Sequence, residues 1–454
     1  MKLKKILSVA LAAAFLLSFI AAATDTANET ESDDDRIIPT GYIIPQDESV
    51  TIRSRNALVY SEYDDRYLFA KNDKEALEPA STTKIMVGVM LFEKFAGSFD
   101  TEITVTKDLL EGKEGLSVYL EEGEVLTLRQ LLTILLMHGA NDVSTILAHY
   151  YMKDVESDRD DLEAFAALMT ERAKQLGCEN TVFKNVSGLH AQGAKTVLSD
   201  IIIIAKHAAS LPGFTEMTST DRLTVGSHII LSRNHLVSSY MTPLYKTPGV
   251  TGMNYGSTEE MGECLLTSAE YDGKRYFIII MGGRNDSETG RQTEYDDTIK
   301  LLEYARTGFE YKDVLKKGVI ITQADVRFST TTDKVSLVPA KTVTMYLPVG
   351  ADLKEEITFR TVVPETELDA PVAQGTEAGE IIVMYNGDEV CRVPLVTASS
   401  VVQSRILYTL DRIENFVKKP IVIASIIAFF VILAIYVLIK AFAINRRKKH
   451  KRIR

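Results

Sequence analysis

The stretch Pro79-Ala80-Ser81-Thr82-Thr83-Lys84-Ile85-Met86 places a serine and a lysine three residues apart at the head of an apolar run. Residues i and i+3 of a helix share a face, so a helix that begins at Ser81 brings the Lys84 amine within reach of the Ser81 hydroxyl. The following residues are apolar nearly all round, which is typical of a buried helix. Burial disfavours the charged amine, so Lys84 can accept the serine proton near neutral pH. The pattern indicates a nucleophile beside its base.

The same pattern also has a structural interpretation. Ser81 could cap the helix, and Lys84 could extend from its first turn to solvent. A single Ser-x-x-Lys motif is common by chance, so other parts of the chain must decide between the two interpretations.

Composition limits the class of protein. A chain of 454 residues with 46% apolar residues is long enough for two or three domains with real cores. The formal charge is −11, although the residues after Ile439 include eight basic and no acidic ones. The rest of the chain is therefore strongly acidic, which excludes nucleic acid as a partner. Cys178, Cys264 and Cys391 are too scattered for a disulfide framework or a metal site, and we expect small buried hydrophobic side chains there.

The N-terminus has the basic, apolar and small-residue regions of a secretory signal peptide over residues 1–23. We expect cleavage after Ala23, and a retained N-terminal anchor is the alternative. Export follows in both cases. Residues 24–37 are acidic with almost no apolar side chains, which predicts a disordered spacer.

Near the other end, Ile421 to Ile439 form a segment of nineteen residues without a charge, long enough to cross a bilayer as one helix. We expect a juxtamembrane segment over 401–419, a transmembrane helix over 420–444 and a basic tail over 445–454. The tail should stay in the cytoplasm by the positive-inside rule. The prediction is a single-pass protein of the cell membrane whose catalytic domain is extracytoplasmic.

Residues 38–312 read as an α+β domain with a helical middle and an antiparallel sheet. Alternating apolar residues at 57–60 and 66–70 predict one hairpin, and residues 262–269 and 275–281, joined across Asp272-Gly273, predict another. Thr127-Leu-Arg-Gln130 is a capping box that opens a buried helix, which breaks at residues 138–142. Further helices are predicted at 161–176, stopped by Gly177, and at 201–209 and 293–306.

Residues 313–400 change character and predict a separate, small all-β domain. Its short apolar segments occur at regular spacing, and we expect strands at 319–321, 326–328, 335–338, 343–347, 357–363, 381–385 and 389–396.

Three separated segments now resemble one family. They are Glu78-Pro-Ala-Ser-Thr-Thr-Lys-Ile-Met86, Phe183-Lys-Asn-Val-Ser-Gly-Leu-His190, and Gly249-Val-Thr-Gly252 followed by Gly262-Glu-Cys-Leu265. Together they resemble the low-molecular-mass penicillin-binding proteins, the serine D-Ala-D-Ala carboxypeptidases (peptidase S11-like). The β domain and C-terminal membrane attachment also fit that family. The resemblance implies a fold similar to the class A β-lactamases, whose site combines S-x-x-K, S-x-N and K-T-G.

The resemblance also assigns roles. Ser81 would be the acylated nucleophile, Lys84 its base, and Asn141 the amide of the second motif. The backbone N–H groups of Ser81 and Ser257 would form the oxyanion hole, which does not depend on side chains. The substrate-binding positions would be Arg233, directed at a carboxylate, together with Asn254, Gly256 and Thr258.

The second and third motifs depart from the family pattern. S-x-N reads Gly139-Ala140-Asn141, so the hydroxyl is missing, and K-T-G reads Asn254-Tyr255-Gly256, so the cation is missing. Lys246-Thr247-Pro248-Gly249 falls before the correct register and carries a proline, so we interpret it as a decoy. His138 and Ser144 lie near the lost hydroxyl, and both are expected to be structural.

The sequence thus predicts a carboxypeptidase that trims the terminal D-alanine of peptidoglycan stem peptides through an acyl-enzyme. The departures in the second and third motifs leave open whether its activity is full or attenuated. β-Lactams would be covalent ligands, and no cofactor or metal is needed. The alternative is a catalytically inactive homologue that binds peptidoglycan or acts as a scaffold at the cell surface. A β-lactamase is disfavoured by the β domain and the transmembrane helix.

Overall fold

The computed structural model describes residues 35–40, 42, 50–111, 114–240 and 242–450. The expected signal peptide, most of the acidic spacer and the last four residues of the basic tail lie outside these ranges. The described chain divides into two compact units. One comprises residues 40–311 and 346–351, and the other comprises the remaining residues, mainly 312–345 and 352–450. Each unit is described by itself.

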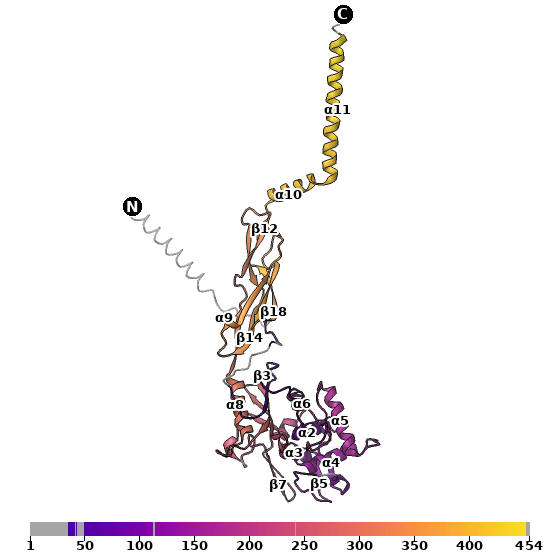
Figure 1. The fold of residues 1–454 in the computed structure, drawn as a ribbon, viewed down its shortest axis with the longest axis vertical. Helices are drawn as coiled ribbons and strands as arrows, with labels where there is room; N and C mark the ends of the chain where they lie inside the picture. Colours follow the sequence, from indigo (N-terminus) through magenta and orange to yellow (C-terminus); the bar gives the residue numbers. More distant parts are fainter. Residues whose placement is uncertain (1–34, 41, 43–49, 112–113, 241, 451–454) are drawn as a thin grey trace, which may run out of the picture. The chain divides into compact units, whose positions relative to one another are not determined.

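The first unit is built on a five-stranded antiparallel sheet, in the order β3-β2-β10-β9-β8 (Figure 1). Both predicted hairpins are confirmed, and β8 completes the sheet at one edge. The strands are β2 (Asn56–Ser61), β3 (Arg66–Lys71), β8 (Val250–Thr258), β9 (Gly262–Tyr271) and β10 (Lys274–Gly283).

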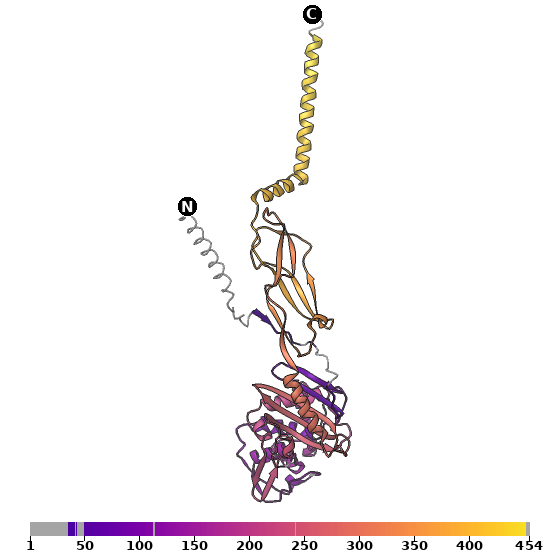
Figure 2. The same ribbon diagram turned by 90° about the vertical axis from the view of Figure 1, so that its left-hand side faces the viewer.

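Alternation along the strands produces a core on each face of the sheet. On one face, Val59 and Ile278 pack against Leu301 and Leu302 of α8 (Thr293–Thr307). Figure 2 shows α8 lying across the strands. On the other face, Leu58 joins the larger core of the helical region. Successive side chains of a strand point to opposite faces of the sheet. Both faces of this sheet are buried, because helices cover each of them.

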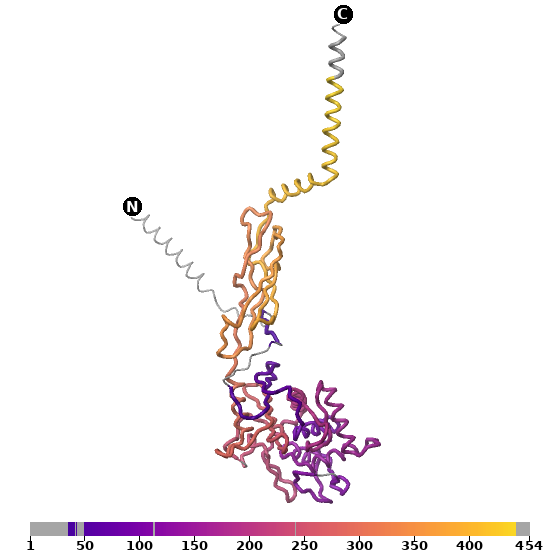
Figure 3. Tube along the Cα trace, in the orientation of Figure 1, coloured from indigo at the N-terminus to yellow at the C-terminus, as the bar shows by residue number. Residues whose placement is uncertain are grey.

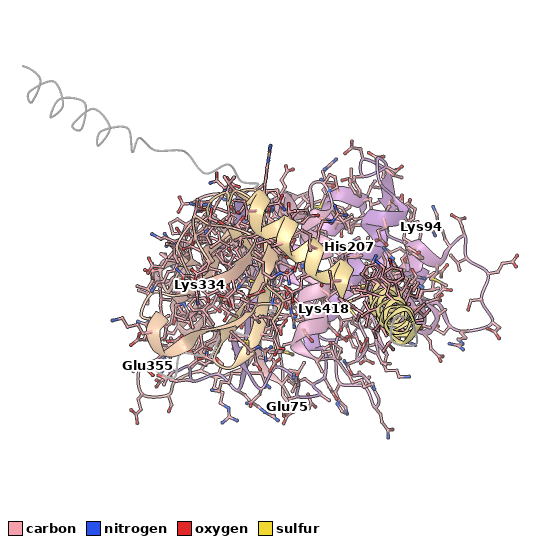
Figure 4. All side chains as sticks on the ribbon, turned by 90° about the horizontal axis from the view of Figure 1, so that it is seen from above. Glu75, Lys94, His207, Lys334, Glu355 and Lys418 are labelled. Atoms are coloured by element: carbon pink, nitrogen blue, oxygen red, sulfur yellow. The ribbon has the colours of Figure 1, made fainter. Side chains whose placement is uncertain are left out.

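The helical middle is confirmed, and it lies on the face of the sheet opposite α8 (Figure 1). The capping box at Thr127 starts the second long helix, which ends at His138, and the next residue, Gly139, has a left-handed φ of 78°. Lys94, at the end of α2, lies at the surface (Figure 4). The helices are η2 (Ala80–Thr82), α2 (Thr83–Lys94), α3 (Leu128–His138), α4 (Asn141–Met152), α5 (Asp161–Gln175), α6 (Leu198–Ser210) and α7 (Phe214–Thr218).

The sequence patterns miss two small hairpins in this unit. The first pairs β4 (Glu102–Thr104) with β5 (Val125–Thr127), and the second pairs β6 (Arg222–Val225) with β7 (His228–Leu231). Each strand has only three or four residues, which is too short for the alternation of apolar and polar residues to be recognised as a strand pattern.

The second unit contains the expected all-β region, and Figure 3 traces its long strands in orange. Six strands form one sheet in the order β15-β17-β18-β13-β12-β16, and β1-β14-β11 form another. The strands are β1 (Arg36–Ile37), β11 (Phe309–Leu315), β12 (Thr322–Arg327), β13 (Lys334–Pro339), β14 (Thr342–Pro348), β15 (Ile357–Val362), β16 (Leu368–Asp369), β17 (Glu377–Tyr385) and β18 (Asp388–Thr397).

Two expectations for this region are wrong. Residues 319–321 are not a strand, because Val319 and Ile320 are 51% and 64% exposed and the strand begins at Thr322. Arg36 and Ile37, expected at the end of a disordered spacer, instead pair in parallel with Thr342 and Val343.

The C-terminal part of this unit is helical. The expected juxtamembrane segment contains α10 (Arg405–Val417), and α11 (Pro420–His450) follows it. Within the described residues, one helix is long and apolar enough to cross a membrane, over the 22 residues Pro420–Ala441.

Candidate active site

Ser81 lies on the 3-10 turn η2 that leads directly into α2, as the sequence pattern requires. The preceding residue, Ala80, is buried and has a left-handed φ of 47°. Ser81 is half-buried, and its Oγ makes no hydrogen bond with any residue that the structure describes. The hydroxyl is therefore available for chemistry rather than used as a helix cap, which was the structural alternative.

Lys84 lies one turn further on and is only 2% exposed. Its Nζ donates a 2.6 Å hydrogen bond to the carbonyl oxygen of Ser187. Burial, and secondarily the positive charge of Arg233, lower the pKa of Lys84 to about 7. The amine therefore has the property that the sequence predicts for a base, although a backbone carbonyl rather than Ser81 accepts its hydrogen bond.

A loop at residues 185–190 holds this arrangement. The amide of Asn185 closes the loop, since its Oδ1 accepts from the N–H of Gly188 at 2.7 Å and its Nδ2 donates to the carbonyl of Leu189 at 2.8 Å. Gly188 packs so closely that a Cβ there would lie 1.8 Å from the carbonyl oxygen of Ala80. The loop motif thus positions the acceptor of Lys84 and clamps the turn that carries Ser81.

Strand β8 borders Ser81 on another side. A Cβ built on Gly256 would lie 2.0 Å from Ser81 Oγ, so the strand passes the hydroxyl at van der Waals distance. The neighbouring Ser257 is exposed and continues β8 opposite Glu263. The structure therefore brings the first and third predicted motifs together, and glycine is the residue that this approach permits.

The second motif lies at the break between α3 and α4. Asn141 begins α4 and is 4% exposed, and its Nδ2 donates to the carbonyl of Glu114 at 2.6 Å. No hydrogen bond joins Asn141 to Lys84 or Ser81 in the described part of the chain. At Gly139, a Cβ would meet only the carbonyl oxygen of Tyr255, at 3.4 Å. The missing hydroxyl therefore belongs to a position that faces the third motif.

Arg233 supplies a cation beside these motifs. Its backbone N–H donates to the carbonyl of Met137 at 3.1 Å, and its own carbonyl accepts from Tyr295 Oη at 3.1 Å. The guanidinium lies 5.2 Å from the ring centre of Tyr255. Over the described ranges it has no ion pair or hydrogen bond, although it is half-buried. Such a cation is suited to receive an anion.

The remaining predicted positions of the third motif have mixed surroundings. Asn254 is 3% exposed, and its Nδ2 is buried with no hydrogen-bond partner in the described chain. The Oγ1 of Thr258 accepts from the N–H of Met261 at 3.0 Å and so stabilises the turn between β8 and β9. Lys246 of the apparent decoy motif is turned toward Asp221, at 3.8 Å.

His138 and Ser144, the two groups near the lost hydroxyl, both bond to backbone. Ser144 is fully buried and donates to the carbonyl of Val186 at 2.6 Å. The Nδ1 of His138 lies 3.1 Å from the carbonyl oxygen of Leu231, and burial lowers the pKa of the imidazole. Both residues have the structural contacts that the sequence analysis expects.

Among the described residues, one group of side chains has the geometry to hold a cation. The ligand atoms of Glu78, His190 and Glu260 all lie within 4.8 Å of one another. Glu78 and His190 already bond to each other at 2.7 Å, and two of the three side chains are exposed. The group forms no part of the Ser81 and Lys84 chemistry.

The fold belongs to the class that the motifs predict. It has a sheet with helices on both faces, a turn carrying Ser81 at the start of a buried helix, and strand β8 with Gly256 beside that turn. Solved structures of similar fold support this class. A D-alanyl-D-alanine carboxypeptidase DacD from Francisella tularensis has a TM-score of 0.57 at 20% identity, covering 80% of this chain and 97% of that one. Penicillin binding protein 6B from Escherichia coli has a TM-score of 0.54 at 22% identity, covering 80% and 99%. The first unit thus has the penicillin-binding-protein fold.

Sequence comparison defines the family. The model of the D-alanyl-D-alanine carboxypeptidases (peptidase S11) matches residues 44–285, and the model of the penicillin-binding protein 5 C-terminal domain matches residues 309–403. The chain is 26% identical over 373 residues to D-alanyl-D-alanine carboxypeptidase DacF of Bacillus subtilis, covering 79% of this chain and 88% of DacF. It is 27% identical over 344 residues to DacD of Salmonella typhimurium, covering 74% and 83%. The chain belongs to the D-alanyl-D-alanine carboxypeptidase family.

Proposed function

We propose that this chain is an active serine-type D-Ala-D-Ala carboxypeptidase that acts on peptidoglycan stem peptides. The observation that carries the proposal is the Ser81 and Lys84 pair. The hydroxyl is half-buried and has no hydrogen bond to any described residue, and one turn away lies a buried amine whose pKa is lowered to about 7. A retained but functionless lysine would have no reason to stay buried without a counter-ion, because desolvating an amine is unfavourable.

In the proposed reaction, Ser81 Oγ attacks the carbonyl carbon of the penultimate D-alanine, and Lys84 accepts the hydroxyl proton. The N–H groups of Ser81 and Ser257 hold the negative oxygen of the tetrahedral intermediate. The C–N bond then breaks, and the departing amine takes the proton that Lys84 carries. Water hydrolyses the acyl-enzyme and releases the shortened peptide. β-Lactams would acylate the same hydroxyl.

The substrate contacts follow from the cation and from β8. Arg233 would receive the terminal carboxylate, because a guanidinium matches a carboxylate in bidentate geometry. Asn254, Gly256 and Thr258 would line the strand along which the peptide lies, and Asn141 would orient it from the opposite side. The hydroxyl missing at Gly139 removes one proton-transfer group, which typically costs about 10²–10⁴-fold in rate. We therefore propose slow turnover rather than loss of chemistry.

We also propose that the protein is a single-pass membrane protein with the catalytic unit outside the cytoplasm. The span would be Pro420–Ala441 of α11, flanked by Lys418 and Lys419 on one side and by the cluster of basic residues from Arg446 on the other. The more basic flank would remain in the cytoplasm.

The test is covalent labelling of the ectodomain with a fluorescent penicillin, together with D-alanine release from a pentapeptide ending in D-Ala-D-Ala. We expect label on Ser81 and slow release, and neither with Ser81→Ala. Absence of both signals from the unchanged protein would support the inactive, peptidoglycan-binding alternative. Label without D-alanine release would show that the site is acylated but not a carboxypeptidase.

The pH dependence of acylation tests the role of Lys84. The rate should rise with pH through about 7 and level off above it, because the amine accepts a proton only after losing its own. The charge of Arg233 contributes to the lowered pKa, so Arg233→Gln should raise the pKa of Lys84 and move the midpoint to higher pH. Labelling rates measured from about pH 5 to about 9 decide the matter. A flat profile, or a midpoint that moves down in the variant, would contradict the assignment.

A further inference from the structure

Tyr255 stands at the centre of the third motif, where the family pattern has a threonine. Its neighbour Gly256 faces Ser81, and adjacent strand residues point to opposite faces, so the Tyr255 ring lies on the other side of β8 from the nucleophile. The guanidinium of Arg233 lies 5.2 Å from the centre of this ring, and it is also near enough to Lys84 for its charge to lower the pKa of that amine. The sequence analysis treats this position only as a departure from the family.

The ring is held rigidly by its own contacts. Its hydroxyl donates a 2.7 Å hydrogen bond to Oε2 of Glu263 on the adjacent strand β9. Its face stacks on Tyr295 of α8, with centres 5.8 Å apart and planes at 23°. Tyr295 is fully buried and also donates to the carbonyl of Arg233, at 3.1 Å. The aromatic pair therefore positions both the side chain and the backbone of Arg233.

The charges around the ring favour this arrangement. Burial and the bond to Glu263 both raise the pKa of Tyr255, so the phenol stays neutral while a carboxylate lies at its far end. A cation over an aromatic face is attracted by the ring's quadrupole. Within the described residues Arg233 has no carboxylate partner, so the ring is the group that restrains its guanidinium while leaving its N–H donors free.

We infer that Tyr255 is a positioning residue that aims Arg233 at the terminal carboxylate of the substrate, taking over the anchoring function of the lysine that is absent at Asn254. This inference rests on the proposed function, because it concerns how the protein binds the terminal carboxylate of the peptide substrate. It implies specificity for peptides with a free carboxylate over the same peptides with a C-terminal amide.

The test is equilibrium binding to protein carrying Ser81→Ala, so that no turnover is required. The probes are a D-Ala-D-Ala peptide with a free carboxylate and its C-terminal amide. Tyr255→Leu should weaken binding of the carboxylate form about tenfold, as expected for loss of a partly desolvated cation–π contact, and leave the amide unchanged. Tyr255→Phe keeps the ring and should lose less than about threefold. Tyr271→Leu is the matched control, since Tyr271, on β9 of the same hairpin, makes a second such pair with Arg306 of α8, at 4.1 Å.

A double variant separates positioning from general disruption. Arg233→Gln should abolish the preference for the carboxylate, and adding Tyr255→Leu should then have no further effect. Equal losses for both peptides, additive losses in the double variant, or an effect of Tyr271→Leu as large as that of Tyr255→Leu would overturn the inference. The proposed function fails on a separate measurement, the labelling of unchanged Ser81. In active protein, Tyr255→Leu should raise KM and leave kcat nearly unchanged.

Discussion

Lys84→Met is expected to lower the rate of acylation by a labelled penicillin about 10²–10⁴-fold while the protein remains folded. Methionine fills a similar volume in the buried space that Lys84 occupies at 2% exposure, but it cannot accept the Ser81 proton. Lys94→Met is the matched control, because Lys94 is an exposed lysine at the other end of the same helix. An unchanged rate in Lys84→Met would disprove the role of the amine.

The same substitution should stabilise the domain. A lysine with a pKa of about 7 in the fold and an ordinary value when unfolded lowers the free energy of unfolding at neutral pH by roughly 4 kcal/mol. Methionine avoids that cost but leaves the Ser187 carbonyl without its donor, so the net gain should be about 1–3 kcal/mol. Between pH 7 and the ordinary lysine pKa, the unfolded chain binds more protons than the folded one, so the stability of the unchanged protein rises with pH. The stabilisation by Lys84→Met should therefore become smaller as the pH rises. Urea unfolding at several pH values measures this.

Gly256→Ala is expected to reduce acylation by at least about 10²-fold, since small misplacements of reacting groups have effects of this size. The added methyl would lie 2.0 Å from Ser81 Oγ and 2.3 Å from its Cβ, so either β8 or the nucleophile turn must move. Overpacking of this kind should also destabilise the protein by about 1–3 kcal/mol.

Gly350→Ala provides the control for this change. A Cβ at Gly350 meets nothing within 4 Å, so neither labelling nor the unfolding transition should shift. If Gly256→Ala labelled as fast as the unchanged protein, the close approach of β8 to Ser81 would not constrain the reaction.

Much of the fold could be predicted because its signals are local. The capping box at Thr127, the turn at Asp272-Gly273 and the alternation of β2 and β10 each lie within a few residues of the structure they define. The expected strand at 319–321 was wrong because apolar residues alone do not make a strand. A strand also needs a partner, and Val319 and Ile320 are exposed instead.

The sequence indicates candidate residues for the site but not the contacts that these residues make. The acceptor for Lys84 is a backbone carbonyl 103 residues away, and no sequence pattern distinguishes that carbonyl from others. Similarly, Asn141 bonds to the carbonyl of Glu114. The stack of Tyr255 on Tyr295 joins a strand and a helix that are distant in sequence, so only the fold brings them together. Periodicity identifies elements, whereas such contacts depend on how those elements pack.

Ala80 bears on how this protein would respond to laboratory evolution. Its left-handed φ of 47° costs an L-residue roughly 1–2 kcal/mol, and burial of its methyl offsets about 0.8 kcal/mol of that. Glycine would remove the strain, but it would also make the backbone before Ser81 more flexible, so the hydroxyl would be held less precisely. Selection for heat resistance alone could accept Ala80→Gly, whereas selection for turnover should reject it. Populations evolved under the two pressures should therefore diverge at residue 80.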